Sequence, residues 1–200
     1  MFKILARFIF IFLFFISGCS IPIQNLDSRG ENVICFGDSI TYGVGAEKGK
    51  DYPSLLQKLL KTKVMNAGVS GDTTEGALQR LERDVLENDP YLVIVELGGN
   101  DYLNGISKKR TLSNLEEIIL KIQEKGAIVA VCDISCGFFM SGYRRDFKKL
   151  AGKTGSIFIP RVLEDILTDP YLKYDNIHPN SEGYEAIAFK IYKTVRPYLK

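Results

Sequence analysis

The sequence contains one histidine in 200 residues, His178, and none of its four cysteines forms a Cys-x-x-Cys pair. A single imidazole excludes every site that needs two of them, such as the zinc site of His-Glu-x-x-His enzymes. Four scattered cysteines also do not build the disulfide framework that holds many small secreted domains together. A site built around one histidine remains open.

The chain also lacks an excess of one charge. Its formal net charge is +2, and Lys3 and Arg7 are the only charged residues among the first 18. The rest of the chain carries 24 basic and 24 acidic residues. Binding to nucleic acid depends on a basic surplus, so we expect no nucleic-acid partner. The length fits one domain, which we expect to be a monomer.

No apolar run is long enough to cross a membrane. The longest, residues 8–16, has 9 residues, whereas a spanning helix needs about 20. This run fits the apolar core of a signal peptide, which has roughly 7–15 residues. Residues 16–19 (Ile-Ser-Gly-Cys) resemble the lipobox of bacterial lipoproteins, in which the cysteine is lipidated. An uncleaved signal anchor or an ordinary signal peptide are the alternatives.

The lipobox resemblance defines the expected organisation of the chain. Residues 1–18 are predicted to be a lipoprotein signal peptide, residues 19–30 the lipidated Cys19 and a polar tether, and residues 31–200 the folded domain. The protein is then exported, and it is anchored in a membrane with its domain facing the periplasm or the cell exterior.

From residue 31, short apolar runs alternate with segments of helical period. The predicted strands are 32–36, 63–66, 91–97, 127–134 and 156–159, and the predicted helices are 52–61, 73–88, 113–125, 143–152 and 181–199. The third and fourth strands are apolar almost throughout, which is typical of strands buried on both faces. The sequence therefore predicts an α/β fold, a three-layer α/β/α sandwich around a parallel sheet of about five strands.

Small and polar residues follow the predicted strands, at the edge where such folds bind ligands. Ser39 follows the first strand, Gly71 the second and Asn100 the third, while Asp175 and His178 share a loop near the end. A serine hydroxyl becomes nucleophilic when an imidazole takes its proton and a carboxylate orients that imidazole. The backbone N–H groups of Ser39 and Gly71 and the Asn100 amide are candidate donors to an oxyanion.

These segments resemble the four sequence blocks of the GDSL, or SGNH, hydrolases. The blocks are Gly-Asp-Ser at 37–39, the stretch 66–72 with Gly71, Gly-Gly-Asn-Asp at 98–101 and Asp-Asn-Ile-His-Pro-Asn at 175–180. The resemblance is strongest to the bacterial periplasmic thioesterase, lysophospholipase and arylesterase branch. It implies the flavodoxin-like fold of that family, a triad of Ser39, Asp175 and His178, an oxyanion hole of Ser39, Gly71 and Asn100, and no metal or cofactor.

The resemblance also implies a serine esterase that hydrolyses acyl esters, lysolipids or thioesters through an acyl-enzyme. Phe138, Phe139 and Met140 follow the fourth strand, and we expect them to contact the acyl chain. A carbohydrate or peptidoglycan O-acetyl esterase and an inactive surface-binding protein remain alternatives. An α/β-hydrolase fits less well, because 37–41 lacks the second glycine of Gly-x-Ser-x-Gly.

Overall fold

The computed structural model describes residues 21–137 and 139–199. Five parallel strands form one sheet in the order β2-β1-β3-β4-β5. The strands are β1 (Asn32–Gly37), β2 (Val64–Gly68), β3 (Pro90–Glu96), β4 (Ile128–Cys132) and β5 (Ile157–Ile159). The predicted fold class is therefore confirmed.

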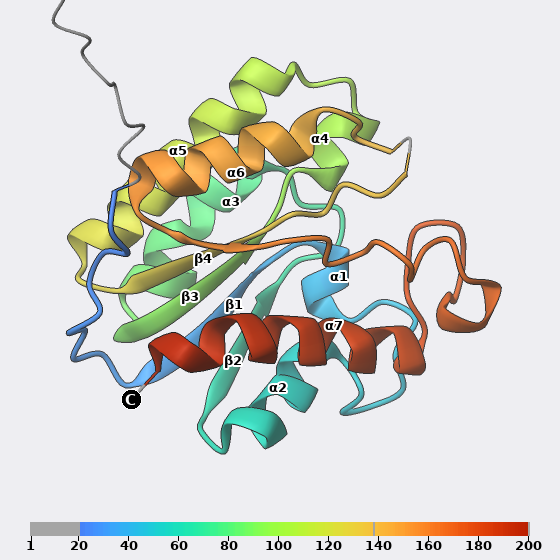
Figure 1. Cartoon of the computed structure of the whole chain (residues 1–200), viewed down its shortest axis with the longest axis horizontal. Coiled ribbons are helices and arrows are strands. Elements are labelled where there is room, and N and C mark those ends of the chain that lie inside the picture. The colour runs from blue at the N-terminus through green and yellow to red at the C-terminus, as the bar shows by residue number, and fades with distance from the viewer. Residues whose placement is uncertain (1–20, 138, 200) are drawn as a thin grey trace, which may run out of the picture.

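Helices cover both faces of the sheet, as Figure 1 shows. One layer contains α3 (Thr74–Leu81), α5 (Lys108–Glu124) and α6 (Tyr143–Thr154), and the other contains α2 (Tyr52–Leu60) and α7 (Ser181–Val195). Each helix turns an apolar stripe to the sheet; on α5 this stripe consists of Leu115, Ile118, Ile119 and Ile122, all buried.

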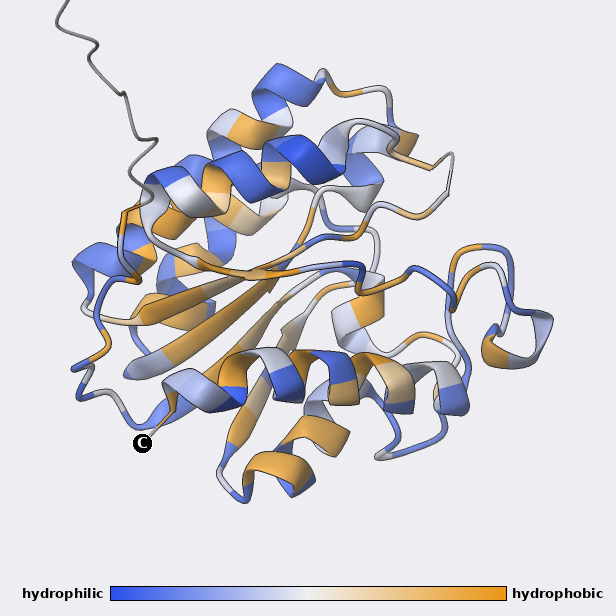
Figure 2. Ribbon diagram, viewed as in Figure 1, coloured by the Kyte–Doolittle hydropathy of each residue, from blue (hydrophilic) through white to orange (hydrophobic). Residues whose placement is uncertain are grey.

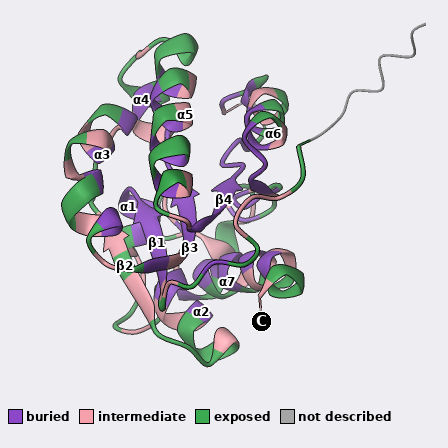
Figure 3. Ribbon diagram, turned by 90° about the vertical axis from the view of Figure 1, so that its left-hand side faces the viewer, coloured by how far each residue is buried: buried purple, intermediate pink, exposed green. Residues whose placement is uncertain are grey.

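The central strands form the core. Every residue of β4 is buried, as is every residue of β3 except Tyr91. Figure 2 shows the apolar strands between helices whose outer faces are hydrophilic, and Figure 3 shows the buried strands at the centre. Burial on both faces explains why these strands lack the alternation of apolar and polar residues that one-sided sheets show.

The carboxyl ends of three strands are in register. Gly37 of β1 pairs with Gly68 of β2 on one side and with Glu96 of β3 on the other. The residues that follow these three strands therefore emerge side by side at one edge of the sheet. This edge is where parallel α/β folds place their ligand sites.

Several element boundaries differ from the prediction. The helix predicted at 73–88 divides into α3 and a π-helical turn, η1 (Glu82–Leu86). The helix predicted at 113–125 begins earlier, at Lys108, because the Ser107 side chain caps it by accepting a hydrogen bond from the N–H of Arg110. After α7 the chain continues as a 3-10 turn, η3 (Arg196–Tyr198).

Two short helices are absent from the prediction. α1 (Ser39–Tyr42) follows β1 and α4 (Gly99–Leu103) follows β3. They contain four and five residues, which is too short for a helical period to be visible in the sequence.

Residues 21–30, predicted to belong to a polar tether, are hydrogen-bonded to the domain. The N–H of Gln24 donates to the carbonyl of Gly155 (2.9 Å), and the Asn25 amide donates to the carbonyls of Gln123 and Ala127 (both 2.9 Å). This segment therefore lies at the amino end of the sheet, where β4 begins. The signal-peptide residues and Cys19 lie outside the described residues, and no helix within 21–137 or 139–199 has the length and hydropathy of a membrane span.

Candidate active site

A sharp strand-to-helix turn places Ser39 at the carboxyl edge of the sheet. Asp38 caps α1, because its Oδ1 accepts a hydrogen bond from the N–H of Ile40 at 3.0 Å. A Cβ on Gly37 would lie 2.0 Å from Thr41 Oγ1 and 2.5 Å from the carbonyl oxygen of Glu96. Only glycine fits there, so the turn depends on it.

His178 and Asp175 share one loop that reaches Ser39 from 139 residues further along the chain. His178 Nε2 lies 3.0 Å from Ser39 Oγ, and its Nδ1 lies 2.8 Å from Asp175 Oδ2. Asp175 Oδ1 accepts hydrogen bonds from the N–H groups of Ile177 (2.8 Å) and His178 (2.9 Å). The structure thus brings together the three residues that the sequence suggests for a triad.

The hydrogen bonds keep Asp175 ionised. Burial by itself would raise the pKa of this carboxyl, but the hydrogen bonds from the His178 ring and from two backbone N–H groups outweigh burial and hold the pKa below its usual value. An ionised carboxylate can only accept a hydrogen bond, so His178 Nδ1 must be the donor to Asp175 Oδ2. The ring therefore carries its proton on Nδ1 and presents the Nε2 lone pair to the Ser39 hydroxyl.

Asn100, near the start of α4, lies beside this group. Its Nδ2 donates to Asp38 Oδ2 (3.1 Å) and to the carbonyl oxygen of Asp72 (2.9 Å). Gly71 precedes Asp72 in an exposed loop and has φ +78°, a left-handed conformation that favours glycine. Asn100 lines the same cavity as Ser39. Gly71 lies in the neighbouring loop, which is hydrogen-bonded to Asn100 through the carbonyl of Asp72.

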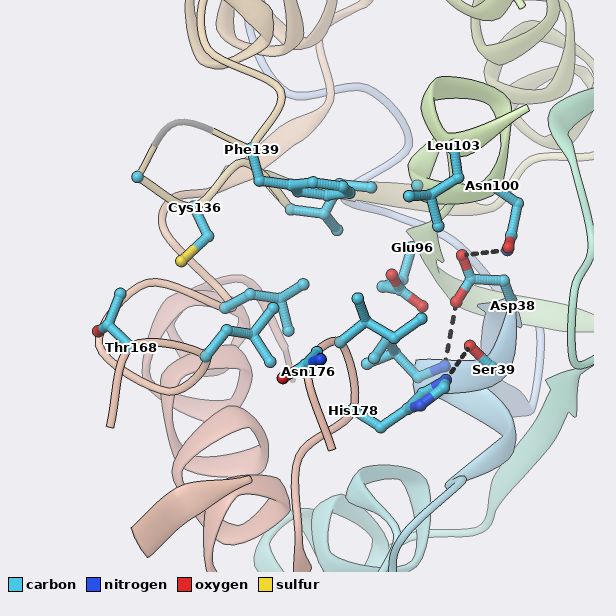
Figure 4. A pocket seen from close by; sticks show the side chains of 17 residues that line it. Asp38, Ser39, Glu96, Asn100, Leu103, Cys136, Phe139, Thr168, Asn176 and His178 are labelled. Atoms are coloured by element: carbon cyan, nitrogen blue, oxygen red, sulfur yellow. Dashed lines mark hydrogen bonds between the residues drawn. The ribbon is translucent and has the colours of Figure 1, made fainter. Parts of the chain in front are cut away.

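Ser39 and His178 open into a cavity of about 410 Å³ (Figure 4). Polar side chains of Asp38, Glu96 and Asn100 lie near the serine. The remaining wall is mostly apolar and is formed by Ile40, Leu103, Ile134, Cys136, Phe139, Leu163, Leu167 and Ile177. The wall also contains Thr168 and Asn176, so the cavity combines polar groups beside Ser39 with a mostly apolar remainder.

The three residues expected to contact an acyl chain have different positions. Phe139 lines the cavity. Met140 is fully buried in the core and is not part of the cavity wall, so direct contact with substrate is excluded by its burial in this structure. Phe138 lies outside the described residues. Sequence reasoning missed Leu163 and Leu167, because they belong to an irregular segment without a periodic pattern.

Two further carboxyl groups lie close to the site. Asp101 is fully buried and accepts a hydrogen bond from the N–H of Thr74 at 2.8 Å, which links α4 to α3. Glu96 ends β3, is 1% exposed and lines the cavity. Sequence reasoning did not single out Glu96; the only available signal was a carboxylate at the end of an apolar strand.

Arg80 on α3 connects the segments that carry the site. Its guanidinium donates to the carbonyls of Gly37 and Ala67 (both 2.9 Å), which end β1 and β2, and to Asp72 Oδ2 (2.7 Å). It also contacts Asp84 at 3.0 Å. One side chain therefore holds the turn before Ser39 and the loop that contains Gly71.

The three cysteines among the described residues, Cys35, Cys132 and Cys136, are buried free thiols. Burial raises the pKa of each of these thiols. A thiol with a raised pKa is a poor nucleophile, so Ser39 remains the candidate nucleophile of the cavity.

Comparisons with known proteins agree with this geometry. Residues 35–186 match the model of the GDSL-like lipase/acylhydrolase family. The arylesterase of Vibrio mimicus is 34% identical over 79% of this chain and 84% of its own length. Thioesterase 1/protease 1/lysophospholipase L1 of Escherichia coli is 29% identical over 85% of this chain and 86% of its own length.

A crystal structure of TesA superposes with a TM-score of 0.78 at 29% identity, covering 84% of this chain and 99% of TesA. On the strength of the family match and of relatives that are similar along most of their length, the chain belongs to the GDSL-like lipase/acylhydrolase family and is a carboxylic ester hydrolase of that type.

Proposed function

We propose that Ser39, His178 and Asp175 are the catalytic triad of an esterase that hydrolyses small acyl esters or thioesters with an apolar acyl group. One observation carries this proposal: the hydrogen-bonded series from Asp175 through His178 to Ser39 ends at the mouth of an apolar cavity. The nucleophile, its base and a place for the acyl chain are thus contiguous.

Acylation follows from the proton positions. Ser39 Oγ attacks the carbonyl carbon of the ester while its proton moves to His178 Nε2. Asp175 stabilises the imidazolium that forms. The tetrahedral intermediate collapses when His178 gives this proton to the leaving alcohol or thiol, and the acyl group remains on Ser39.

Deacylation repeats these steps with water. His178 takes a proton from the attacking water, a second tetrahedral intermediate forms, and Ser39 leaves with the proton from His178. In both intermediates the oxyanion accepts hydrogen bonds from the N–H groups of Ser39 and Gly71 and from the Asn100 amide. The N–H that Asn100 donates to the oxyanion is one that donates to Asp38 or to the Asp72 carbonyl in the free enzyme.

The cavity favours an acyl group longer than acetate. An acetyl group has one methyl to bury, and each additional buried CH₂ contributes about 0.8 kcal/mol. Leu163, Leu167 and Phe139 line the same cavity as Ser39 and offer more apolar surface than one methyl group can cover. This observation favours the acyl esterase over an O-acetyl esterase for carbohydrates.

We further propose that the protein is exported and anchored through lipid on Cys19. The support is the short apolar run followed by Ile-Ser-Gly-Cys. Several acyl chains on one cysteine form a stable anchor, whereas a single chain binds membranes only reversibly. Incorporation of labelled fatty acid into the protein, but not into its Cys19→Ala variant, is the expected result.

The test of the catalytic proposal is hydrolysis of p-nitrophenyl esters from acetate to palmitate by the purified protein. Wild type is compared with Ser39→Ala and His178→Ala. We expect kcat/KM to rise from acetate to medium or long acyl chains, and both variants to lose at least about 10³-fold. Undiminished activity in Ser39→Ala would contradict the assignment, and activity confined to acetate would favour the O-acetyl esterase.

A further inference from the structure

The floor of the cavity holds two carboxyl groups that the triad does not use. Asp38 is 3% exposed and Glu96 is 1% exposed. Their side chains interact directly and both face the cavity next to Ser39 (Figure 4). Two carboxylates in contact at a buried site repel each other, so the pair retains a proton when isolated carboxyls have lost theirs.

The hydrogen-bond donors show where the negative charge lies. Asp38 accepts two N–H groups, from Ile40 at Oδ1 and from Asn100 at Oδ2. Glu96 Oε2 accepts the hydroxyl of Thr41 (2.9 Å), and the backbone N–H of Asp38 also acts on this carboxyl. Glu96 Oε1 itself has no hydrogen-bond partner in the described part of the chain. An ionised oxygen buried without a donor is costly, whereas a protonated Oε1 becomes a donor itself.

We propose that Glu96 is held as the neutral acid in the resting enzyme, that it donates its Oε1 proton to the Asp38 carboxylate, and that this shared proton makes Glu96 a positioning residue for Asn100. The inference rests on the proposed function, because it assigns Asn100 as an oxyanion donor. Glu96 acts through Asp38 and does not itself touch the reacting atoms.

The shared proton matters because Asp38 and the oxyanion compete for one amide. Asn100 has two N–H groups, and in the free enzyme they contact Asp38 Oδ2 and the carbonyl of Asp72. A proton from Glu96 withdraws charge from Asp38, so the amide can turn to the oxyanion. Loss of that proton leaves two negative charges beside the oxyanion and holds the amide on Asp38. Activity then falls as the pair ionises.

The groups around the pair do not offset a second charge. The titratable side chains that interact with the pair are Cys35 of β1, Tyr52 of α2, Asp72, Cys132 of β4, His178 and Tyr184 of α7. Burial raises the pKa of both thiols and both phenols, so these four stay neutral. His178 favours the charge on Asp38 only while its ring is protonated. Burial is the largest of the effects on the pair, and it raises the pKa of both Asp38 and Glu96.

The kinetic test replaces the ionisable group and keeps its hydrogen bonds. In Glu96→Gln the amide can donate to Asp38 and accept from Thr41, but it cannot ionise. We expect the alkaline limb of the pH profile of kcat/KM to shift to higher pH by at least about one unit. At a pH on the falling limb of wild type, kcat/KM of the variant is then about tenfold higher than that of wild type. Glu117→Gln, at an exposed position on α5, is the control and should match the wild-type profile. An unchanged alkaline limb in Glu96→Gln overturns the proposal.

A second readout does not depend on hydrolysis. In Ser39→Ala, which keeps the pair, the infrared spectrum near neutral pH should contain the C=O band of a protonated carboxylic acid, and the added substitution Glu96→Gln should remove it. If the band is absent, Glu96 is not the neutral acid, whatever the esterase assay shows. If the band is present in Ser39→Ala but the wild-type protein hydrolyses no ester, the proposed function fails and the protonation of Glu96 stands.

Discussion

Asn100 combines two roles at the scale of single residues. Its amide joins Asp38 to the carbonyl of Asp72, and it is the side-chain donor of the proposed oxyanion hole. A residue that stabilises charge only in the transition state affects kcat more than KM. The relative changes in kcat and KM therefore distinguish the proposed catalytic role of Asn100 from its structural role.

In Asn100→Ala we expect kcat to fall by about 10²–10³ with a small change in KM, as for loss of one oxyanion donor. The free energy of unfolding should fall by about 1–3 kcal/mol, because the Asp72 carbonyl and Asp38 lose a donor. Steady-state kinetics and urea unfolding measure the two effects. Asn104→Ala, at the exposed end of the same helix, should change neither, and a kcat within threefold of wild type in Asn100→Ala would refute the role.

At the scale of elements, α3 is attached to the sheet through Arg80. The Arg80 side chain is 9% exposed and contacts the ends of β1 and β2 as well as the loop at Asp72. It also lies over the Phe36 ring, with its guanidinium carbon 4.4 Å from the centroid. A planar guanidinium carries five N–H donors spread over three nitrogens and can reach acceptors on several segments, whereas an ammonium group has three donors on a single nitrogen.

We therefore expect Arg80→Lys to be destabilising by about 2–4 kcal/mol, since buried carbonyls and a carboxylate lose their donors. The loop with Gly71 should also become less ordered, so kcat should fall more than KM rises. Arg83→Lys is the matched control, because Arg83 is one turn away, 75% exposed and paired with Asp84 alone. Equal unfolding midpoints for the two variants would show that Arg80 does not join these elements.

At the scale of the whole molecule, the segment through which the chain enters the domain and the candidate active site lie at opposite ends of the sheet. The chain enters the domain at its amino edge, where Gln24 and Asn25 are hydrogen-bonded, and Ser39 lies beyond the carboxyl end of β1. Six residues of strand span about 20 Å. Gln24, the first of these hydrogen-bonded residues, lies five residues after Cys19, and such a connection reaches at most about 18 Å. A domain held through Cys19 would therefore turn its active site away from the membrane.

This orientation predicts that the lipidated enzyme hydrolyses soluble esters well and lysophospholipids of its own bilayer poorly. A flexible Gly/Ser insert of about 30 residues after Ser20 adds a mean reach of about 30 Å and should increase lysophospholipid hydrolysis in the same vesicle. The rate on soluble esters should stay unchanged. The same insert in an unlipidated Cys19→Ala protein is the control. Equally fast hydrolysis with the short connection would contradict the orientation.

The sequence determined the fold class and the predicted triad. Buried strands between amphipathic helices leave a pattern that can be read locally, and a chain with one histidine allows one choice of base. Ser39 and Asn100 also follow strands whose carboxyl ends meet at one edge, so their proximity follows from the rule for parallel sheets. Local patterns sufficed for each of these conclusions.

Only the tertiary structure decided which groups act on that site. The contact of Glu96 with Asp38, the bonds of Arg80 to two strands, and the wall of Leu163 and Leu167 join segments far apart in the chain. The burial of Met140 and the attachment of residues 21–30 are of the same kind. Such contacts depend on how helices and loops pack across the sheet, and packing leaves no periodic pattern in the sequence.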